Sequence, residues 1–241
     1  MHAARRVVIN KLMSDAKQRK SGGGCLSKLL FLPLMAAVIG LGAAMWYVAQ
    51  PQDLTDLESG AQAAASNREL KDVLQSSIDR GFPVSLSEGE INHWLGRTLI
   101  SKQEGFLAEK ITLDRIWVRL EDERAEVIMQ RGFWGHPFTV SMFIQLEKME
   151  DASGKTLDIR PQGGPYHPDL PHPPKGGRFG QLVVPQGFLH LILPAYLKLA
   201  AVFSDETDLA FSRMSQVSIQ KSRLVLDPRE PLGEQGMPMT F

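Results

Sequence analysis

The residues with the clearest capacity for chemistry lie in one proline-rich stretch. His167, Asp169 and His172 stand close together inside a Pro- and Gly-rich segment at 161–178. Two imidazoles and a carboxylate at such spacing could bind zinc or exchange protons with a substrate. No hydrolase or metal motif surrounds them, and proline-rich loops collect such residues by chance. We therefore predict an irregular exposed loop, with no catalytic residue and no metal site.

Two further features resemble reactive sites. The acidic residues Glu121, Asp122, Glu123 and Glu126 could suggest a cation site, but their spacing favours a solvated hairpin. The only cysteine, Cys25, precedes an apolar run, whereas a lipoprotein cysteine would follow one. The chain also contains no G-x-S-x-G, H-E-x-x-H or P-loop motif. The sequence thus predicts a protein that is not an enzyme and has no cofactor.

The apolar run Leu29–Ala49 contains no charged side chain. About 20 helical residues cross the roughly 30 Å hydrocarbon core of a bilayer. We predict one transmembrane helix, with Pro33 in its first turns and Trp46 and Tyr47 at the far interface. A cleaved signal peptide is the alternative, because Gly42-Ala43-Ala44 supplies small residues for cleavage.

Charge is distributed unevenly about this run. Residues 1–28 carry seven Lys or Arg and one Asp, a net of +6, so the remainder of the neutral chain carries −6. The positive-inside rule predicts a single-pass cell-membrane protein with a basic cytoplasmic tail (1–28) and an extracytoplasmic C-terminal part. The expected partner of the tail is the lipid bilayer. A mildly acidic domain argues against nucleic acid binding. Met13 provides a second candidate start beside Met1.

The chain beyond the span divides into three parts. A polar stretch at 50–66 predicts a juxtamembrane linker, residues 67–228 predict one α+β domain, and residues 229–241 predict a flexible tail. About 190 residues beyond the span suffice for a domain with its own core. Apolar spacing predicts a helix over Asn67–Asp79 with Gly81 as its C-cap.

The stretch LSEGEINHWL, residues 86–95, starts with a capping box, because Ser87 and Glu90 can satisfy each other's backbone amides. It resembles the L-S/T-E-x-E-L/I-N-x-x-L element of small single-span bacterial envelope proteins of the YpmS kind, which are distantly similar to tubular lipid-binding (TULIP-like) domains. The matching residues are Leu86, Ser87, Glu88, Glu90, Ile91, Asn92 and Leu95. The resemblance implies a β-rich extracytoplasmic domain with lipid binding as its candidate activity and no catalytic residues. The 161–178 insert departs from the pattern.

Alternating apolar and polar residues predict strands over 116–121, 125–130, 138–147 and 156–160. Short turns join them, which favours antiparallel pairing, since parallel strands need long crossovers. A terminal hairpin is expected over 214–226. The fold class predicted is therefore α+β: an N-terminal transmembrane helix plus one extracytoplasmic domain with a twisted antiparallel sheet packed around a long apolar helix.

That long helix is predicted over Gln186–Phe203, where apolar residues cover most of the circumference. Pro194 should kink it. We expect it to pack against the sheet. Contact with the membrane interface and a second span are the alternatives, and His190 and Lys198 near the middle argue against a span.

These features predict a membrane-anchored, non-enzymatic envelope protein. Its leading function is the binding of a lipid or other apolar ligand, and the alternative is a structural or assembly subunit that meets an envelope protein partner. A hydrolase is the third reading. A lipid binder should enclose an apolar cavity, and a scaffold should expose a flat apolar patch. The ligand-contacting residues predicted are Phe188, Leu191, Ile192, Ala195 and Leu199 on the helix, with Val140, Met142 and Ile144 on the sheet.

Overall fold

The computed structural model describes residues 24–64, 68–102, 113–133, 136–151, 154–167, 169 and 173–229. The chain divides into two compact units, residues 1–46 and 47–241. The predicted tail at 1–28 and the predicted C-terminal tail lie almost entirely outside the described residues. Helix α2 (Gly24–Ala49) contains the candidate span Leu29–Ala49, whose apolar side chains are not buried against protein. The structure thus has one described helix long and apolar enough to cross a membrane, as the sequence predicts.

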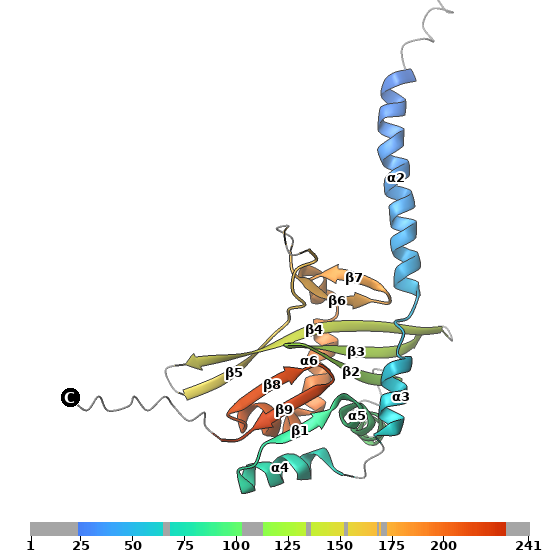
Figure 1. The fold of residues 1–241 in the computed structure, drawn as a ribbon. Coiled ribbons are helices and arrows are strands. Elements are labelled where there is room, and N and C mark those ends of the chain that lie inside the picture. Colours follow the sequence, from blue (N-terminus) through green and yellow to red (C-terminus); the bar gives the residue numbers. More distant parts are fainter. Residues whose placement is uncertain are drawn as a thin grey trace, which may run out of the picture. The chain divides into compact units, whose positions relative to one another are not determined.

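A six-stranded antiparallel sheet forms the centre of the second unit (Figure 1). Its strands are β2 (Arg115–Glu121), β3 (Arg124–Phe133), β4 (His136–Asp151), β5 (Gly154–Arg160), β6 (Lys175–Phe179) and β7 (Leu182–Pro185). The order is β2-β3-β4-β6-β7, and β5 pairs with a different segment of the β4 edge that also holds β6. The predicted meander from β2 to β5 is confirmed. The structure is a mixed α+β fold with a twisted antiparallel sheet.

A second sheet of three described strands covers part of the first. It has the order β1 (Val84–Ser87), β9 (Arg223–Asp227), β8 (Gln216–Gln220). The predicted terminal hairpin is therefore confirmed, and the extended segment before residue 87 supplies its third strand. Helix α4 (Leu70–Arg80) precedes this sheet and ends at Gly81, whose φ of +66° is a left-handed conformation that suits glycine.

Helix α5 (Glu88–Lys102) starts with the predicted capping box. The Ser87 amide and hydroxyl donate to the Glu90 carboxylate at 2.9 and 2.8 Å, and the Glu90 amide donates to Ser87 Oγ at 3.2 Å. These hydrogen bonds lower the pKa of the Glu90 carboxyl, because they favour its charged form. They satisfy amides that a helix N-terminus otherwise leaves without partners.

Helix α5 also protects the outer edge of β2. Asn92, which is buried, donates to the Val118 carbonyl at 2.8 Å and accepts from the Val118 amide at 2.7 Å. One turn earlier, the Glu88 carboxylate accepts from the Leu120 amide at 2.6 Å. The Ser222 amide donates to the Leu120 carbonyl at 3.0 Å. Polar side chains at i and i+4 on one helix thus replace the missing neighbour strand and cover an edge that would otherwise be open to pairing.

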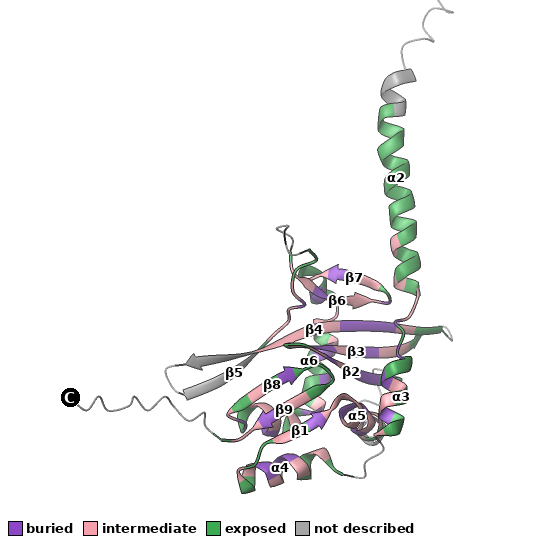
Figure 2. Ribbon diagram, in the orientation of Figure 1, coloured by how far each residue is buried: buried purple, intermediate pink, exposed green. Residues whose placement is uncertain are grey.

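The main sheet is covered on both faces, and Figure 2 shows buried segments along the middle of β4 and on α5. The first face bears Ala125, Val127 and Met129 of β3 and packs against α5, the apolar helix after residue 192, and the smaller sheet. The second face bears the alternate residues of the same strands. A separate core of Leu54, Leu57, Ala61, Trp117 and Ile128 lies there.

The second core changes the interpretation of the predicted linker at 50–66. Thr55–Ala63 forms helix α3, and its Leu57 and Ala61 are buried against the second face. The Gln52 amide also donates to Thr139 Oγ1 at 2.9 Å. The segment is polar overall, but one apolar stripe is enough to dock it. The folded unit therefore includes residues predicted to be a linker.

The prediction that 161–178 holds no regular strand is wrong at its end. Residues from Lys175 onward form β6, which pairs with β4 around Ser141 and Met142. Gly177 permits this pairing, since a Cβ there would lie 1.9 Å from the Ser141 carbonyl oxygen. The glycines that suggested a loop instead allow two backbones to approach closely.

The predicted long helix over Gln186–Phe203 is two helices. A 3₁₀ helix, η2 (Gln186–Leu191), is followed by α6 (Leu193–Val202), with Ile192 between them. Pro194 lies in the first turn of α6, where its missing N–H costs nothing, whereas further inside a continuous helix its ring would clash with the preceding turn. The proline therefore starts a new helix and does not kink one. Beyond it lie α7 (Ser204–Thr207) and the π-helical turn η3 (Asp208–Ser212).

Candidate functional site

An apolar hollow lies between the first face of the sheet and the elements that cover it. It has a volume of about 310 Å³. Its walls come from α4, α5, β1 to β5, α6, α7, η3 and the β8–β9 hairpin, and its lining is apolar apart from Glu206, Thr207 and the Tyr196 hydroxyl. Ligand pockets measure roughly 300–1,000 Å³, and a cavity of about 150 Å³ accepts benzene. The hollow, called the first-face cavity below, is therefore large enough for one alkyl or acyl chain.

The opening of the first-face cavity is marked by the lining residues that solvent reaches. Ile159 of β5 is 40% exposed, and Ala200 of α6 is also exposed. Glu206, Thr207 and Phe211, on α7 and η3, are half-buried. The opening therefore lies where β5, α6 and the α7–η3 segment meet, and its polar groups lie at this rim.

An ion pair connects two elements of the cavity wall. Lys71 Nζ on α4 lies 3.1 Å from Asp205 Oδ2 on α7, and both side chains are largely exposed. The Asp205 carboxylate raises the pKa of the Lys71 ammonium, first through their hydrogen bond and then through its charge. Exposed pairs of this kind contribute little to stability, so this contact adds little to the packing of α4.

The structure brings three of the eight predicted ligand-contacting residues to the first-face cavity. Met142 and Ile144 of β4 and Leu199 of α6 line it. Val140 is buried on the same face but does not line it. Ile192 and Ala195 pack against the apolar core beside it. These placements follow from the break before α6, which alters which side of each helix meets the sheet.

The other two predicted residues point to solvent. Phe188 is 51% exposed and Leu191 is 74% exposed, and Leu197 on α6 is 62% exposed. The expectation that residues 186–203 are buried round most of their circumference is therefore wrong. The 3₁₀ segment and α6 bury one side only, and their outer side is apolar as well.

Tyr196 anchors α6 to the sheet. Its hydroxyl lies 2.8 Å from the Val127 carbonyl oxygen and 3.1 Å from the Val140 carbonyl oxygen. Burial raises the pKa of the Tyr196 phenol well above its usual range, and the charge of Glu126 adds to this shift. The phenol therefore stays a neutral donor to the sheet. Its ring forms part of the cavity wall, and Trp94 meets Phe203 edge-on nearby with ring centroids 5.6 Å apart.

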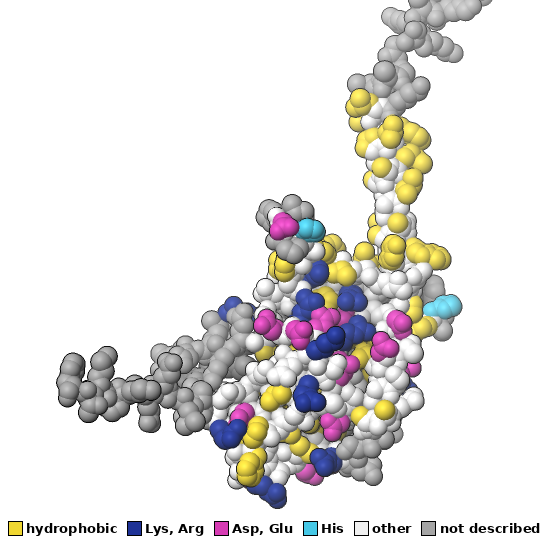
Figure 3. Space-filling model, viewed as in Figure 1, with side chains coloured by type: hydrophobic (Ala, Val, Ile, Leu, Met, Phe, Trp, Pro, Cys, Tyr) yellow, Lys and Arg dark blue, Asp and Glu magenta, His cyan; other side chains and the backbone are white. Residues whose placement is uncertain are grey.

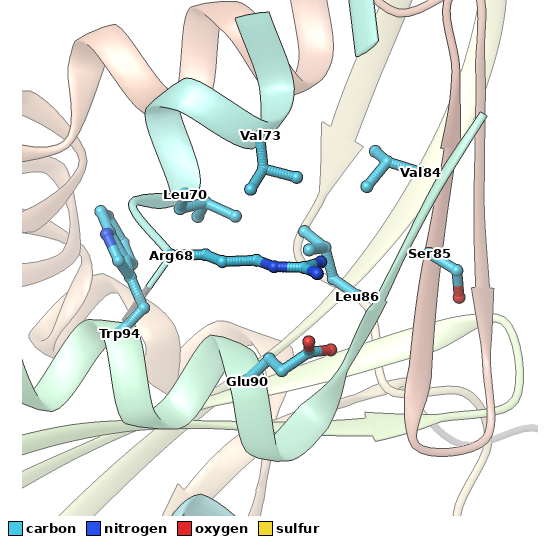
Figure 4. Close-up of a pocket in the computed structure, with 8 residues that line it drawn as sticks. All are labelled: Arg68, Leu70, Val73, Val84, Ser85, Leu86, Glu90 and Trp94. Carbon is cyan, nitrogen blue, oxygen red and sulfur yellow. The ribbon is translucent and has the colours of Figure 1, made fainter. Parts of the chain in front are cut away.

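A smaller hollow of about 50 Å³ adjoins the first-face cavity and shares Leu70, Leu86 and Trp94 with it. Figure 4 shows the Arg68 side chain extending between α4 and α5, with its guanidinium near Leu86 and Glu90. The Arg68 charge contributes to the lowered pKa of Glu90. Because Glu90 already balances this arginine, the smaller hollow is a weaker candidate for a ligand than the cavity beside it.

The second face of the sheet carries a buried charge cluster, and its Leu57 and Arg119 also line a polar hollow of about 530 Å³. Glu126 is fully buried and accepts hydrogen bonds from Arg119 at 3.0 Å and Ser141 Oγ at 2.5 Å. Arg178 Nε lies 3.4 Å from Glu126 Oε1, the oxygen that also accepts from Ser141, and the Arg178 guanidinium lies over the Phe143 ring at 5.6 Å. Figure 3 shows basic and acidic side chains interspersed in the middle of the viewed face. Two arginines on one carboxylate form a structural ion-pair network.

The residues that could do acid–base chemistry are only loosely associated. His167 Nδ1 lies 3.9 Å from Asp169 Oδ2, and both side chains are mostly exposed. His172 lies outside the described residues. Within the described part of the chain, no three His, Cys, Asp or Glu side chains are grouped as metal ligands. Glu121 pairs with Arg124, and Asp122 accepts a hydrogen bond from the Lys221 amide at 3.1 Å.

No protein-family model matches the sequence, and no curated protein matches it significantly. The resemblance to YpmS-like envelope proteins stays a prediction. The residues that carry it include Glu88 and Asn92, which hold the edge of β2 in this fold.

Sequence reasoning missed much of the cavity lining. Leu70, Ile219, Leu224 and Phe211 come from four elements distant in the sequence from β4. Each had an apolar helical or strand pattern, but no local signal assigned it to a shared hollow. Only the pairing of the β8–β9 hairpin with β1, and the docking of α4 and η3, bring them together.

Proposed function

We propose that this chain is a membrane-anchored, non-enzymatic envelope protein whose extracytoplasmic domain binds one alkyl or acyl chain in the first-face cavity. The observation that carries the proposal is the hollow of about 310 Å³ with an almost wholly apolar lining. Transfer of an apolar chain from water into such a site is favoured by roughly 25 cal/mol per Å² of apolar surface buried. The charge asymmetry about Leu29–Ala49 supports the proposed anchor and orientation.

The lining also indicates which part of a ligand is recognised. Walls without buried donors, acceptors or charges can bind a hydrocarbon chain but cannot position a polar headgroup. Glu206 and Thr207 lie at the rim, where a headgroup would remain in water. The proposed ligand is therefore selected by the length and shape of its chain and only weakly by its headgroup.

A cavity-filling substitution tests this proposal. Ala210 of η3 is half-buried in the cavity lining, so Ala210→Trp should occupy ligand space. The full-length protein is purified from its native membrane, and bound lipid is measured by mass spectrometry. We expect a stoichiometric lipid on the unmodified protein and its loss from Ala210→Trp, with the melting temperature preserved.

The matched control is Ala195→Trp, because Ala195 packs against the core but does not line the cavity. It should overpack and destabilise the fold by about 1–3 kcal/mol without removing lipid specifically. Lipid around the anchor is common to all variants and cancels in the comparison. Equal lipid content in the unmodified protein and Ala210→Trp would contradict the proposal.

The exposed apolar residues of η2 and α6 favour a second candidate, the structural or assembly subunit. Phe188, Leu191 and Leu197 are the kind of surface that such a subunit would present to a protein partner. Cross-linking of the native membrane distinguishes the candidates. A stoichiometric protein adduct at these residues, with no lipid in the cavity, would favour the assembly subunit.

A further inference from the structure

The exposed apolar residues of η2 and α6 form a continuous strip. Its members are Phe188, Leu191, Pro194, Leu197 and Ala201, all of them exposed. Successive members are three or four residues apart. In a 3₁₀ helix residues i and i+3 eclipse, and in an α-helix residues three or four apart share a face. The strip therefore continues across the break at Ile192 on one side of the segment.

The opposite side of α6 is already occupied. Tyr196 and Leu199 are buried there, and both line the first-face cavity. The strip consequently has no partner within the described residues and presents three large apolar side chains to solvent. Leu191, at 74% exposure, is the most exposed of them.

The segment that carries the strip has basic side chains and no acidic ones. Residues 186–202 contain no Asp or Glu, and their basic side chains are His190 and Lys198, both exposed. The acidic residues begin immediately after this segment, at Asp205. Apolar side chains flanked by basic ones suit the boundary between acyl chains and anionic headgroups, where a lysine stem can extend toward the phosphates.

The chain that leads into the strip contacts Tyr47, a residue of the second unit. Within the second unit, the Gln181 amide donates to the Tyr47 carbonyl at 3.0 Å, and Tyr47 lies in the last turn of the Leu29–Ala49 helix. From Gln181 the chain continues through β7 directly into η2. At no more than about 3.6 Å per residue, Phe188 lies within roughly 25 Å of Gln181. Within the second unit, the chain that leads into the strip is therefore hydrogen-bonded to the residues at which the candidate span ends.

We propose that the strip lies in the headgroup region of the same bilayer that the Leu29–Ala49 helix crosses. This inference rests on the membrane anchor of the proposed function and does not depend on a ligand in the cavity. It makes η2 and α6 an interfacial segment with one side on lipid and the other on the core. Contact with the membrane interface was one of the alternatives that the sequence offered for residues 186–203. The proposal assigns this contact to the five residues of the strip.

Fluorescent labelling of single cysteines tests the proposal in the full-length protein. Cys25 is the only cysteine, so Cys25→Ser gives a background in which Leu191→Cys carries an environment-sensitive fluorophore. The protein is placed in nanodiscs of phosphatidylcholine and phosphatidylglycerol, with or without a spin label on the upper acyl chain. We expect a blue-shifted emission that the lipid spin label quenches and that aqueous iodide does not.

Two control positions make each outcome informative. Phe82→Cys replaces another exposed apolar residue, 64% exposed, between α4 and β1, and its probe should respond to iodide and not to the spin label. Leu34→Cys lies inside the candidate span, so its probe must be shielded from iodide if the anchor exists. An iodide-accessible probe at Leu34 would overturn both the anchor and the strip proposal.

With the anchor intact, the strip proposal is overturned by either of two results at position 191. One is a probe as accessible to iodide as that at Phe82. The other is a probe shielded from iodide but untouched by lipid spin labels, which would show that a second copy or another protein covers the strip. Leu197→Cys repeats the measurement on α6, and an unchanged melting temperature for each variant ensures that the fold is preserved.

Discussion

The two faces of the main sheet are built from alternate residues of the same strands, yet different elements cover them. On the second face, α3 and the segment after β5 pack closely over Trp117, Ile128 and Phe143, and the charge of Glu126 is enclosed between arginines. On the first face, many more elements converge and leave a hollow of about 310 Å³. The apolar hollow thus lies on the first face, whereas the buried ion-pair network lies on the second.

This contrast indicates why the cavity is a candidate site. Protein interiors are normally packed as densely as organic crystals, and empty apolar volume costs stability. An apolar face that its own side chains leave underfilled has space that an apolar ligand can occupy. The substitutions below test whether changes on the two faces have different effects on the free energy of unfolding.

The largest effect is expected from Glu126→Ala on the second face. It leaves Arg119 and Arg178 without their shared carboxylate, and breaking a buried ion pair in this way costs about 3–5 kcal/mol. Urea unfolding of the full-length protein, followed by tryptophan fluorescence, measures the loss. The control is Asp205→Asn, which breaks the exposed pair with Lys71 and should leave the midpoint unchanged. Equal midpoints for the two variants would show that the buried ion pairs of Glu126 stabilise the fold no more than the exposed pair does.

Matched truncations on the two faces sharpen the comparison. Ile128 is fully buried on the second face, so Ile128→Ala should cost about 2–5 kcal/mol. Ile144 lines the hollow on the first face, where fewer neighbours lose contact, so Ile144→Ala should cost clearly less. Denaturation of ligand-free protein gives both values. A larger loss at position 144 would indicate that the first face is as densely packed as the second.

One substitution should stabilise the second face. The side-chain amide of Gln52 is buried and has no hydrogen-bond partner among the described residues. A buried polar group without a partner costs about 1–3 kcal/mol, so Gln52→Met should raise the melting temperature. Gln181→Met, at an exposed position, serves as the control. A fall in the melting temperature of Gln52→Met would show that the side-chain amide of Gln52 stabilises the fold.

The smallest effect concerns α5, which forms a wall of the first-face cavity. Ser87→Ala removes the cap of this helix and should cost about 1 kcal/mol at neutral pH. Because the folded-state pKa of Glu90 is lowered, its contribution is present above the ordinary glutamate pKa and is lost as the pH falls through the folded-state value. The difference between Ser87→Ala and the unmodified protein should therefore shrink in acid. A constant difference across that pH range would argue against the Ser87–Glu90 coupling.

Periodicity predicted the elements whose signals are local. The strands from Arg115 to Arg160, the terminal hairpin, the cap at Ser87 and the left-handed Gly81 are as expected. The misses have physical causes. A mostly polar stretch concealed the docking stripe of α3, glycines required for close strand pairing resembled a loop, and Pro194 started a helix where a kink was expected.

The sequence predicted apolar ligand contacts between the helix and the sheet, but it did not predict most of the residues that line the cavity. Met142, Ile144 and Leu199 were assigned from pattern, because their elements are adjacent in any sheet-and-helix packing. Leu70, Phe211 and Leu226 enter through tertiary pairings that a single sequence does not encode locally. Leu191 was wrongly predicted to be buried. Apolar residues occur on both sides of this segment, so the pattern could not show which side meets the sheet.

Residues 47–55 belong to the folded second unit and do not form a free linker. The Gln181 amide donates to the Tyr47 carbonyl, the Gln52 amide donates to Thr139 Oγ1, and α3 begins at Thr55. If Leu29–Ala49 anchors the protein as proposed, no free segment among these residues would let the domain carry a ligand to a second membrane. A lipid bound in the cavity would then be exchanged only with the membrane that holds the anchor or with a partner that binds there.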